Sequence, residues 1–240
     1  MGKLFRYELR LIAFNRFYLG FFAVSLCFGW LILSTETIQG VAHTAPFSPW
    51  SFGSYLMAMM PLLSIALIFM LWSFDSGQAR RAKPLISAAT VVPVRHAAVK
   101  CAAAATAWLL LSAAIVLLGI GFLIFIFGNV VSIAALLAPS VSILLPAMLF
   151  LIGSGLLALS RSRMVFLAIP PALLALHLLP LPAWMHLLVS DFYSTYPLHM
   201  DMLDPGFTVP VSYIAGKLAY AFAGIIMLAL ALRKKYSYRP

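Results

Sequence analysis

Acidic residues are scarce in this chain. It has six Asp and Glu residues in 240, and charged residues of both signs together make up 9% of the sequence. A typical soluble domain is about one quarter charged and about half apolar, whereas 64% of this chain is hydrophobic and its mean hydropathy is +1.04. The scarcity of charge excludes an ordinary soluble domain and predicts an all-α integral membrane protein.

Signatures of catalytic and metal sites are missing as well. The two cysteines, Cys27 and Cys101, belong to separate apolar runs, so we expect neither a disulfide framework nor a zinc cluster. The chain has no G-x-x-x-x-G-K-[ST] pattern, which excludes nucleotide binding through a P-loop, and no H-E-x-x-H zinc motif. We expect no catalytic residue, no metal ligand and no cofactor in this chain.

Long apolar runs are what the sequence does contain. A helix needs about 20 apolar residues to cross a bilayer, and several runs come close to or exceed that length. They comprise residues 17–34, 55–74, 101–127, 130–159, 164–181 and 211–232. The loops between them are too short for a separate folded domain. We therefore expect residues 1–240 to form a single membrane domain of about six transmembrane helices.

The basic residues predict the orientation of this domain. Fifteen of the 16 Lys and Arg residues fall on one side of a six-span arrangement, and positively charged loops normally stay in the cytoplasm. The exception is Lys217, inside the last run. Both termini are therefore expected on the cytoplasmic side. Because the positive charge flanks the apolar runs, it indicates topology and contact with membrane lipid rather than nucleic-acid binding.

Two segments outside the spans are partly apolar. Residues 1–16 place Phe5, Leu9 and Ile12 on one side of a helix and the basic residues on another, which predicts an amphipathic helix at the membrane interface. Residues 180–210, on the outer side, are too hydrophobic for a solvated loop and are interrupted by Pro and Asp. We expect short re-entrant or interfacial helices in this outer segment.

The connection of residues 75–100 is the longest loop on the cytoplasmic side. It combines charged residues with an apolar stretch, residues 85–92, that is costly to leave in water. The stretch should therefore pack against another surface. We expect a short helix that ends at Pro93, since helices usually stop before a proline.

The loop also has a distinctive order of residue types: an acid, basic residues, a leucine-rich segment, a proline, an arginine and a lysine that opens the next span. These residues are Asp75, Arg80, Arg81, Leu85, Ile86, Ala89, Pro93, Val94, Arg95 and Lys100. Together with the basic N-terminal helix, the six spans and the outer segment, this order resembles the permease subunits of type-2 ATP-binding-cassette (ABC) exporters. The resemblance covers the whole chain.

The resemblance implies a function and partners. The loop would be the coupling helix, which enters a groove on a separate ATPase subunit. Two ATPase copies would bind ATP and Mg²⁺, and a second copy or homologue of the permease would complete an exporter in the bacterial inner membrane. This chain would then be a transport subunit and not an enzyme. The contact with the ATPase would fall on Asp75, Arg80, Arg81, Leu85, Ile86, Pro93 and Arg95.

The side chains of the predicted spans indicate which class of substrate the protein would transport. Aromatic and methionine residues are frequent, and no acid lies inside a span apart from Asp75 at an inner edge, which favours a hydrophobic, amphipathic or peptide-like substrate. Candidates for the substrate path are Phe21, Phe28, Met57 and Met60.

Two alternatives remain open. A membrane-embedded enzyme could use the acids and histidines of the outer side, and a non-catalytic assembly or immunity protein could use the same spans without transport. The outer residues concerned are His186, Asp191, His199, Asp201 and Asp204.

Overall fold

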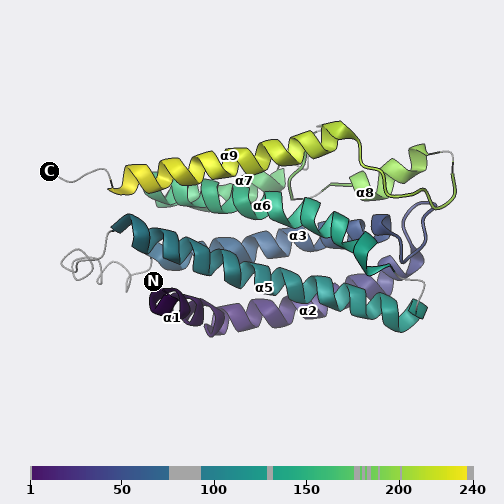
Figure 1. The fold of residues 1–240 in the computed structure, drawn as a ribbon, viewed down its shortest axis with the longest axis horizontal. Helices are drawn as coiled ribbons and strands as arrows, with labels where there is room; N and C mark the ends of the chain where they lie inside the picture. Colours follow the sequence, from purple (N-terminus) through teal and green to yellow (C-terminus); the bar gives the residue numbers. More distant parts are fainter. Residues whose placement is uncertain are drawn as a thin grey trace.

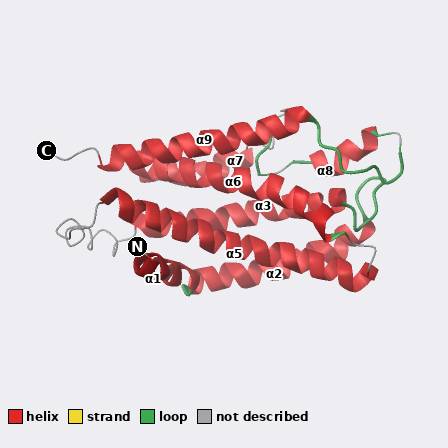
Figure 2. Cartoon of the chain, in the orientation of Figure 1, coloured by secondary structure: helices red, strands yellow, loops and turns green. Residues whose placement is uncertain are grey.

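The computed structural model describes residues 2–75, 93–128, 132–175, 179, 182, 185–188, 190–200 and 202–236. Throughout these residues the regular structure is helical, and no strand occurs among them (Figure 2). The helices are α1 (Gly2–Ala13), α2 (Arg16–Thr35), η1 (Thr37–Gln39), α3 (Pro49–Trp72), η2 (Ser73–Asp75), α5 (Pro93–Phe127), α6 (Ile133–Arg161), α7 (Arg163–Ala175), α8 (Phe192–Thr195), η6 (Tyr196–His199) and α9 (Val211–Tyr236).

The long helices confirm the prediction of an all-α membrane protein. Within the described part of the chain, five helical stretches are long and apolar enough to cross a bilayer. They are Arg16–Gln39, Pro49–Trp72, Val94–Phe127, Ile133–Arg161 and Val211–Arg233. Of the other predicted span, residues 164–181, the structure describes residues 164–175, which belong to the 13-residue helix α7, and residue 179; residues 176–178, 180 and 181 lie outside the described part of the chain. Two adjacent prolines, Pro170 and Pro171, lie inside α7, and by itself this helix is shorter than the roughly 20 residues that a span requires.

The third predicted span is longer than expected. Pro93 opens α5, so residues 93–100, which were predicted as part of the loop, are helical. The short helix predicted before Pro93 lies outside the described residues. Proline suits the first turn of a helix because the missing N–H has no intrahelical partner there. At about 1.5 Å per residue, the 35 residues of α5 extend well beyond a hydrocarbon core of about 30 Å.

The long helices run side by side along the longest dimension of the molecule (Figure 1). One end holds α1, the start of α5, the junction between α6 and α7 and the end of α9; we call it the basic end, because Lys3, Arg95, Arg161 and Arg233 lie there. The opposite end holds α8, and we call it the α8 end. This separation agrees with the charge distribution that the sequence predicted.

Buried polar side chains join the helices through backbone carbonyl groups. The Tyr18 hydroxyl donates to the Ala107 carbonyl oxygen at 2.9 Å, the Tyr55 hydroxyl to that of Ile115 at 3.2 Å, and the Trp108 indole N–H to that of Leu63 at 2.9 Å. These bonds fix α2 and α3 against α5. Such pairing is required inside a bilayer, where water cannot satisfy a polar group.

Candidate functional site at the basic end

The predicted coupling segment leaves and re-enters the bundle at the basic end. Asp75 is the last residue of η2, directly after α3, and Pro93 is the first residue of α5. The Arg95 side chain, two residues further, is exposed. The other predicted contacts with an ATPase, Arg80, Arg81, Leu85 and Ile86, lie outside the described residues. The structure thus places three of the seven predicted contact residues: Asp75 and Pro93, at the two ends of the segment, and Arg95.

A buried acid ties α1 to the first turns of α5. A Glu8 carboxylate oxygen lies 3.8 Å from His96 Nε2 and 3.8 Å from Lys100 Nζ, and its side chain is 9% exposed. Lys100 Nζ also lies 5.9 Å from the centre of the Phe74 ring, in η2. An opposite charge offsets the cost of burying a carboxylate. The helix that follows the coupling segment is therefore joined both to α1 and to the end of α3.

Sequence reasoning did not select Glu8, although a signal was present. Glu8 lies between Phe5, Leu9 and Ile12, on the apolar face of α1, where an acid is unexpected. The structure confirms that this face packs inward, since Ile12 is 5% exposed and Phe5 and Leu9 contact the core. An acid on the inward face of an otherwise basic helix needs a cationic partner, which Lys100 supplies, and the His96 ring lies beside the same carboxylate.

Reversing the charge of Glu8 should release α1. In Glu8→Lys, three basic side chains would face one another, and we expect a loss of about 1–2 kcal/mol, since the groups are only partly exposed to water. The measurement is the thermal midpoint of the detergent-purified chain. The double variant Glu8→Lys/Lys100→Glu should recover most of the loss, whereas Glu36→Lys, at an exposed acid, should change little. A double variant as unstable as Glu8→Lys would contradict the pairing.

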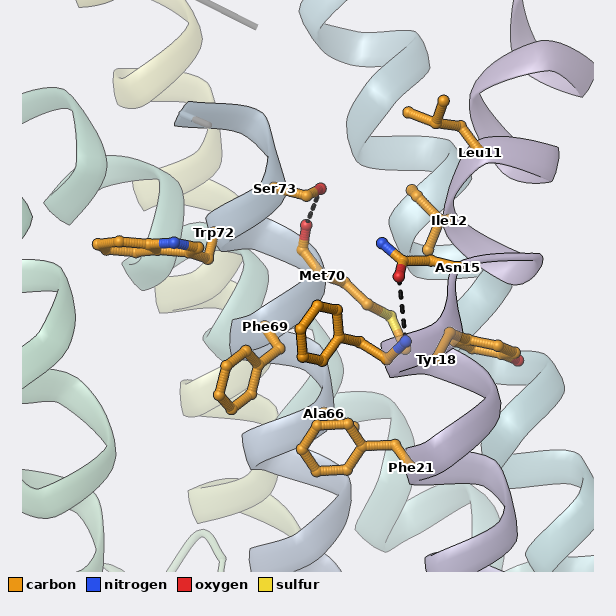
Figure 3. A pocket seen from close by; sticks show the side chains of 11 residues that line it. Leu11, Ile12, Asn15, Tyr18, Phe21, Ala66, Phe69, Met70, Trp72 and Ser73 are labelled. Atoms are coloured by element: carbon orange, nitrogen blue, oxygen red, sulfur yellow. Dashed lines mark hydrogen bonds between the residues drawn. The ribbon is translucent and has the colours of Figure 1, made fainter. Parts of the chain in front are cut away.

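An apolar cavity of about 320 Å³ lies beside this junction, between the α1–α2 corner and α3. Figure 3 shows Leu11, Ile12 and Asn15 on one side and Phe69 and Met70 on the other. The Asn15 side chain also caps α2, because its Oδ1 accepts a hydrogen bond from the Phe17 N–H at 3.0 Å.

The four substrate-path candidates do not come together. Phe21 lines this cavity, whereas Phe28 is 40% exposed on α2. Met57 and Met60 are 3% and 0% exposed and belong to the packed core of α3. Of the four, Phe21 is the one among the described lining residues of this cavity. Sequence could not separate these residues, because lining, packing and lipid-facing positions on an all-apolar helix have the same residue types.

The α8 end is closed by a group of aromatic rings around Trp50, near the start of α3. We call this group the aromatic cluster, and its members are Trp50, Phe192, Tyr193, Tyr196, Phe207 and Tyr213. The Trp50 side chain is 0% exposed, and its indole N–H donates to the Pro205 carbonyl oxygen at 3.0 Å. Burial raises the pKa of the Tyr193 phenol, which keeps this ring neutral. The predicted outer segment therefore includes a well-packed aromatic part.

Of the acids at this end, Asp204 uses its carboxylate to hold a loop, whereas the bonds of Asp191 are made by its backbone carbonyl oxygen. Asp204 accepts a hydrogen bond from the Ala45 N–H at 3.0 Å and donates its own N–H to the His43 carbonyl oxygen at 3.0 Å. The Asp191 carbonyl oxygen accepts from the Ser194 and Thr195 hydroxyls at the start of α8. Among the residues that the structure describes, no three His, Cys, Asp or Glu side chains come together as a metal site would require. Asp201 and His177 lie outside those residues.

Lys217, the basic residue that does not fit the charge pattern, is buried and binds the backbone of the segment that precedes α8. It is 3% exposed, its Nζ donates to the His186 carbonyl oxygen at 2.9 Å, and it lies 5.1 Å from the centre of the Tyr213 ring. One turn further along α9, the Tyr220 hydroxyl donates to the Met185 carbonyl oxygen at 2.5 Å. Lysine and tyrosine on one face of α9 thus fasten residues 185–186 to the bundle.

Comparison with known proteins identifies no relative: no protein-family model, no curated protein and no solved structure matches this chain.

Proposed function

We propose that this chain is the permease subunit of an ABC exporter of the bacterial inner membrane, with six spans and with both termini in the cytoplasm. The observation that supports this proposal most directly is the arrangement of the basic end. The segment between Asp75 and Pro93 starts and finishes there, and the helix that follows it is joined to α1 through Glu8. A partner that moves this segment would act on α5 and α1 together.

The mechanism follows from that arrangement. The chain has no P-loop, so ATP and Mg²⁺ would be bound by two copies of a separate ATPase subunit. Closure of the ATPases would push the coupling segment, and α5, a continuous helix from Pro93 to Phe127, would carry the movement toward the α8 end. The rings of the aromatic cluster would have to move apart for a transport path to open at the α8 end. Such coupling requires that the ATPase contact the two conformations differently.

The apolar interior favours a hydrophobic, amphipathic or peptide-like cargo. The cavity beside Phe21 and Phe69 is lined mainly by apolar side chains, with Asn15 and Ser73 among its polar residues. A second permease copy or homologue would form the other half of the transport path. In the enzyme alternative, the outer acids would need to act on a substrate, but Asp204 is engaged in holding a loop.

Co-purification tests the proposal. The tagged full chain, co-expressed with its neighbouring genes and purified in mild detergent, should retain a P-loop ATPase in stoichiometric amount. The triple variant Leu85→Asp/Ile86→Asp/Arg95→Glu should lose at least nine tenths of it, because it removes the apolar anchor and reverses a charge at the proposed contact. Mass spectrometry of the purified sample provides the measurement.

A matched control uses another exposed arginine of the basic end. Arg161→Glu, at the end of α6, should leave the ATPase bound. A folded, monodisperse wild-type chain without any ATPase would overturn the exporter proposal. Equal loss of the ATPase in the triple variant and in Arg161→Glu would overturn the assignment of residues 75–95 as the contact.

A further inference from the structure

The cavity between the α1–α2 corner and α3 opens sideways. Three of its lining residues are large, apolar and exposed: Leu11, Phe17 and Phe69 are 56%, 73% and 52% exposed. Behind them lie Ile12, which is 5% exposed, and Ala66, which is 1% exposed. In a protein surrounded by lipid, exposed apolar side chains at an opening face hydrocarbon. The cavity is therefore accessible from the bilayer.

Two exposed arginines adjoin the lining residues of this cavity along the chain, although neither is itself a lining residue. Arg10 precedes the lining residue Leu11, and Arg16 stands between the lining residues Asn15 and Phe17. Both arginine side chains are exposed, and the Arg10 guanidinium lies 5.8 Å from the centre of the exposed Phe14 ring. The acid of α1, Glu8, is turned away from the rim and is bound to α5. No acid is among the described residues that line the cavity.

These observations specify a ligand by its chemistry. An exposed apolar opening, with Arg10 and Arg16 next to its lining residues at the α1–α2 junction, fits a molecule with an apolar chain and an anionic head. A volume of about 320 Å³ is at the small end of the range for drug-sized ligands, so the cavity holds part of a chain and not a whole lipid. Arginine forms paired hydrogen bonds with phosphate oxygens.

We propose that this cavity binds an anionic phospholipid from the leaflet at the basic end, with an acyl chain between α2 and α3 and the phosphate at Arg10 and Arg16. The lipid joins the α1–α2 corner to α3, much as Glu8 joins α1 to α5. The proposal rests on the cavity and its rim alone, so it holds whether or not the chain binds an ATPase.

Native mass spectrometry of the full chain in detergent tests this site, with phosphatidylglycerol and phosphatidylcholine of identical acyl chains as probes. Wild type should retain one phosphatidylglycerol at least ten-fold more tightly than phosphatidylcholine. Arg10→Gln/Arg16→Gln should lose this preference. The control Arg161→Gln/Arg233→Gln removes the same charge from the ends of α6 and α9, which do not line the cavity, and should keep it.

A second variant tests the cavity itself. Ala66→Leu fills space at the inner wall, and it should weaken retention of both lipids at least five-fold while the chain stays monodisperse. If Ala66→Leu unfolds the chain, the bulkier Ser73→Leu at the rim replaces it, with the same expectation. Equal retention of the two lipids by wild type, a preference that survives Arg10→Gln/Arg16→Gln, or unchanged retention in the filled variant would each overturn the proposal. A failure of the chain to bind an ATPase would not contradict the lipid-site proposal.

Discussion

Gly153→Val should separate α6 from α9 and prevent the chain from folding stably. A Cβ atom built on Gly153 would lie only 2.0 Å from the Gly224 carbonyl oxygen, and one built on Gly224 would lie 2.4 Å from the Leu149 carbonyl oxygen. Both obstacles are backbone atoms, which cannot rotate away as a side chain can. Small residues allow this close approach between helices in a membrane, and an overpacked contact of this kind costs about 3 kcal/mol or more.

The measurement is the fraction of monodisperse chain after detergent extraction, together with the thermal midpoint of what remains. Gly121→Val is the matched control, because a Cβ atom at Gly121 meets no atom within 4 Å and the substitution is the same. The control should melt within a few degrees of wild type. If Gly153→Val and Gly121→Val were equally stable, the α6–α9 contact would not be as close as the structure describes.

This glycine pair marks the limit of what the sequence predicts. Gly153 and Gly155 in the fourth run suggest close helix packing, but only the structure identifies Gly224 in α9 as the partner of Gly153. Apolar composition indicates that helices pack, whereas the partner of each helix depends on shape, which a list of similar apolar residues does not reveal. The same reason explains why Met57 and Met60, predicted on a substrate path, are packed core residues.

The charge pattern predicted more than the apolar pattern did. The grouping of Lys and Arg separated the two ends of the bundle correctly, because the energy of placing a charge in hydrocarbon is large and constrains every arrangement. It also isolated Lys217, whose burial and bond to the His186 carbonyl oxygen explain why it lies apart from the others. Glu8 could have been found in the same way, from its position on the apolar face of α1.

Five of the six predicted spans correspond to helices that are long and apolar enough to cross a bilayer. Of the remaining predicted span, residues 164–181, the structure describes residues 164–175, which belong to α7 and include Pro170 and Pro171, and residue 179. The start of α5 differs from the prediction, because Pro93 begins a helix that was expected to begin later. Proline lacks the N–H that continues a helix but suits its first turn.

Trp50→Ala should loosen the α8 end more than any other single truncation there. The indole is fully buried, contacts the rings of Phe192, Tyr196 and Phe207 with centroid separations of 6.1, 5.7 and 5.0 Å, and holds the Pro205 carbonyl oxygen. Removing it leaves both a cavity and an unpaired carbonyl group. A buried Trp→Ala change costs about 3–5 kcal/mol, so we expect a lower thermal midpoint and faster amide hydrogen exchange over residues 190–200.

Two further variants separate the contributions to this loss. Trp50→Phe keeps an aromatic ring but removes the N–H donor, and it should retain part of the stability that Trp50→Ala loses. Trp30→Ala removes the same side chain from α2, where it is 52% exposed and touches only Phe122 among aromatic rings of the described chain; it should leave exchange at residues 190–200 unchanged. If Trp50→Ala and Trp30→Ala had equal effects, the aromatic cluster would not be what closes the α8 end, and an exporter would have to open there by moving other contacts, such as the hydrogen bond that Lys217 forms with the His186 carbonyl oxygen.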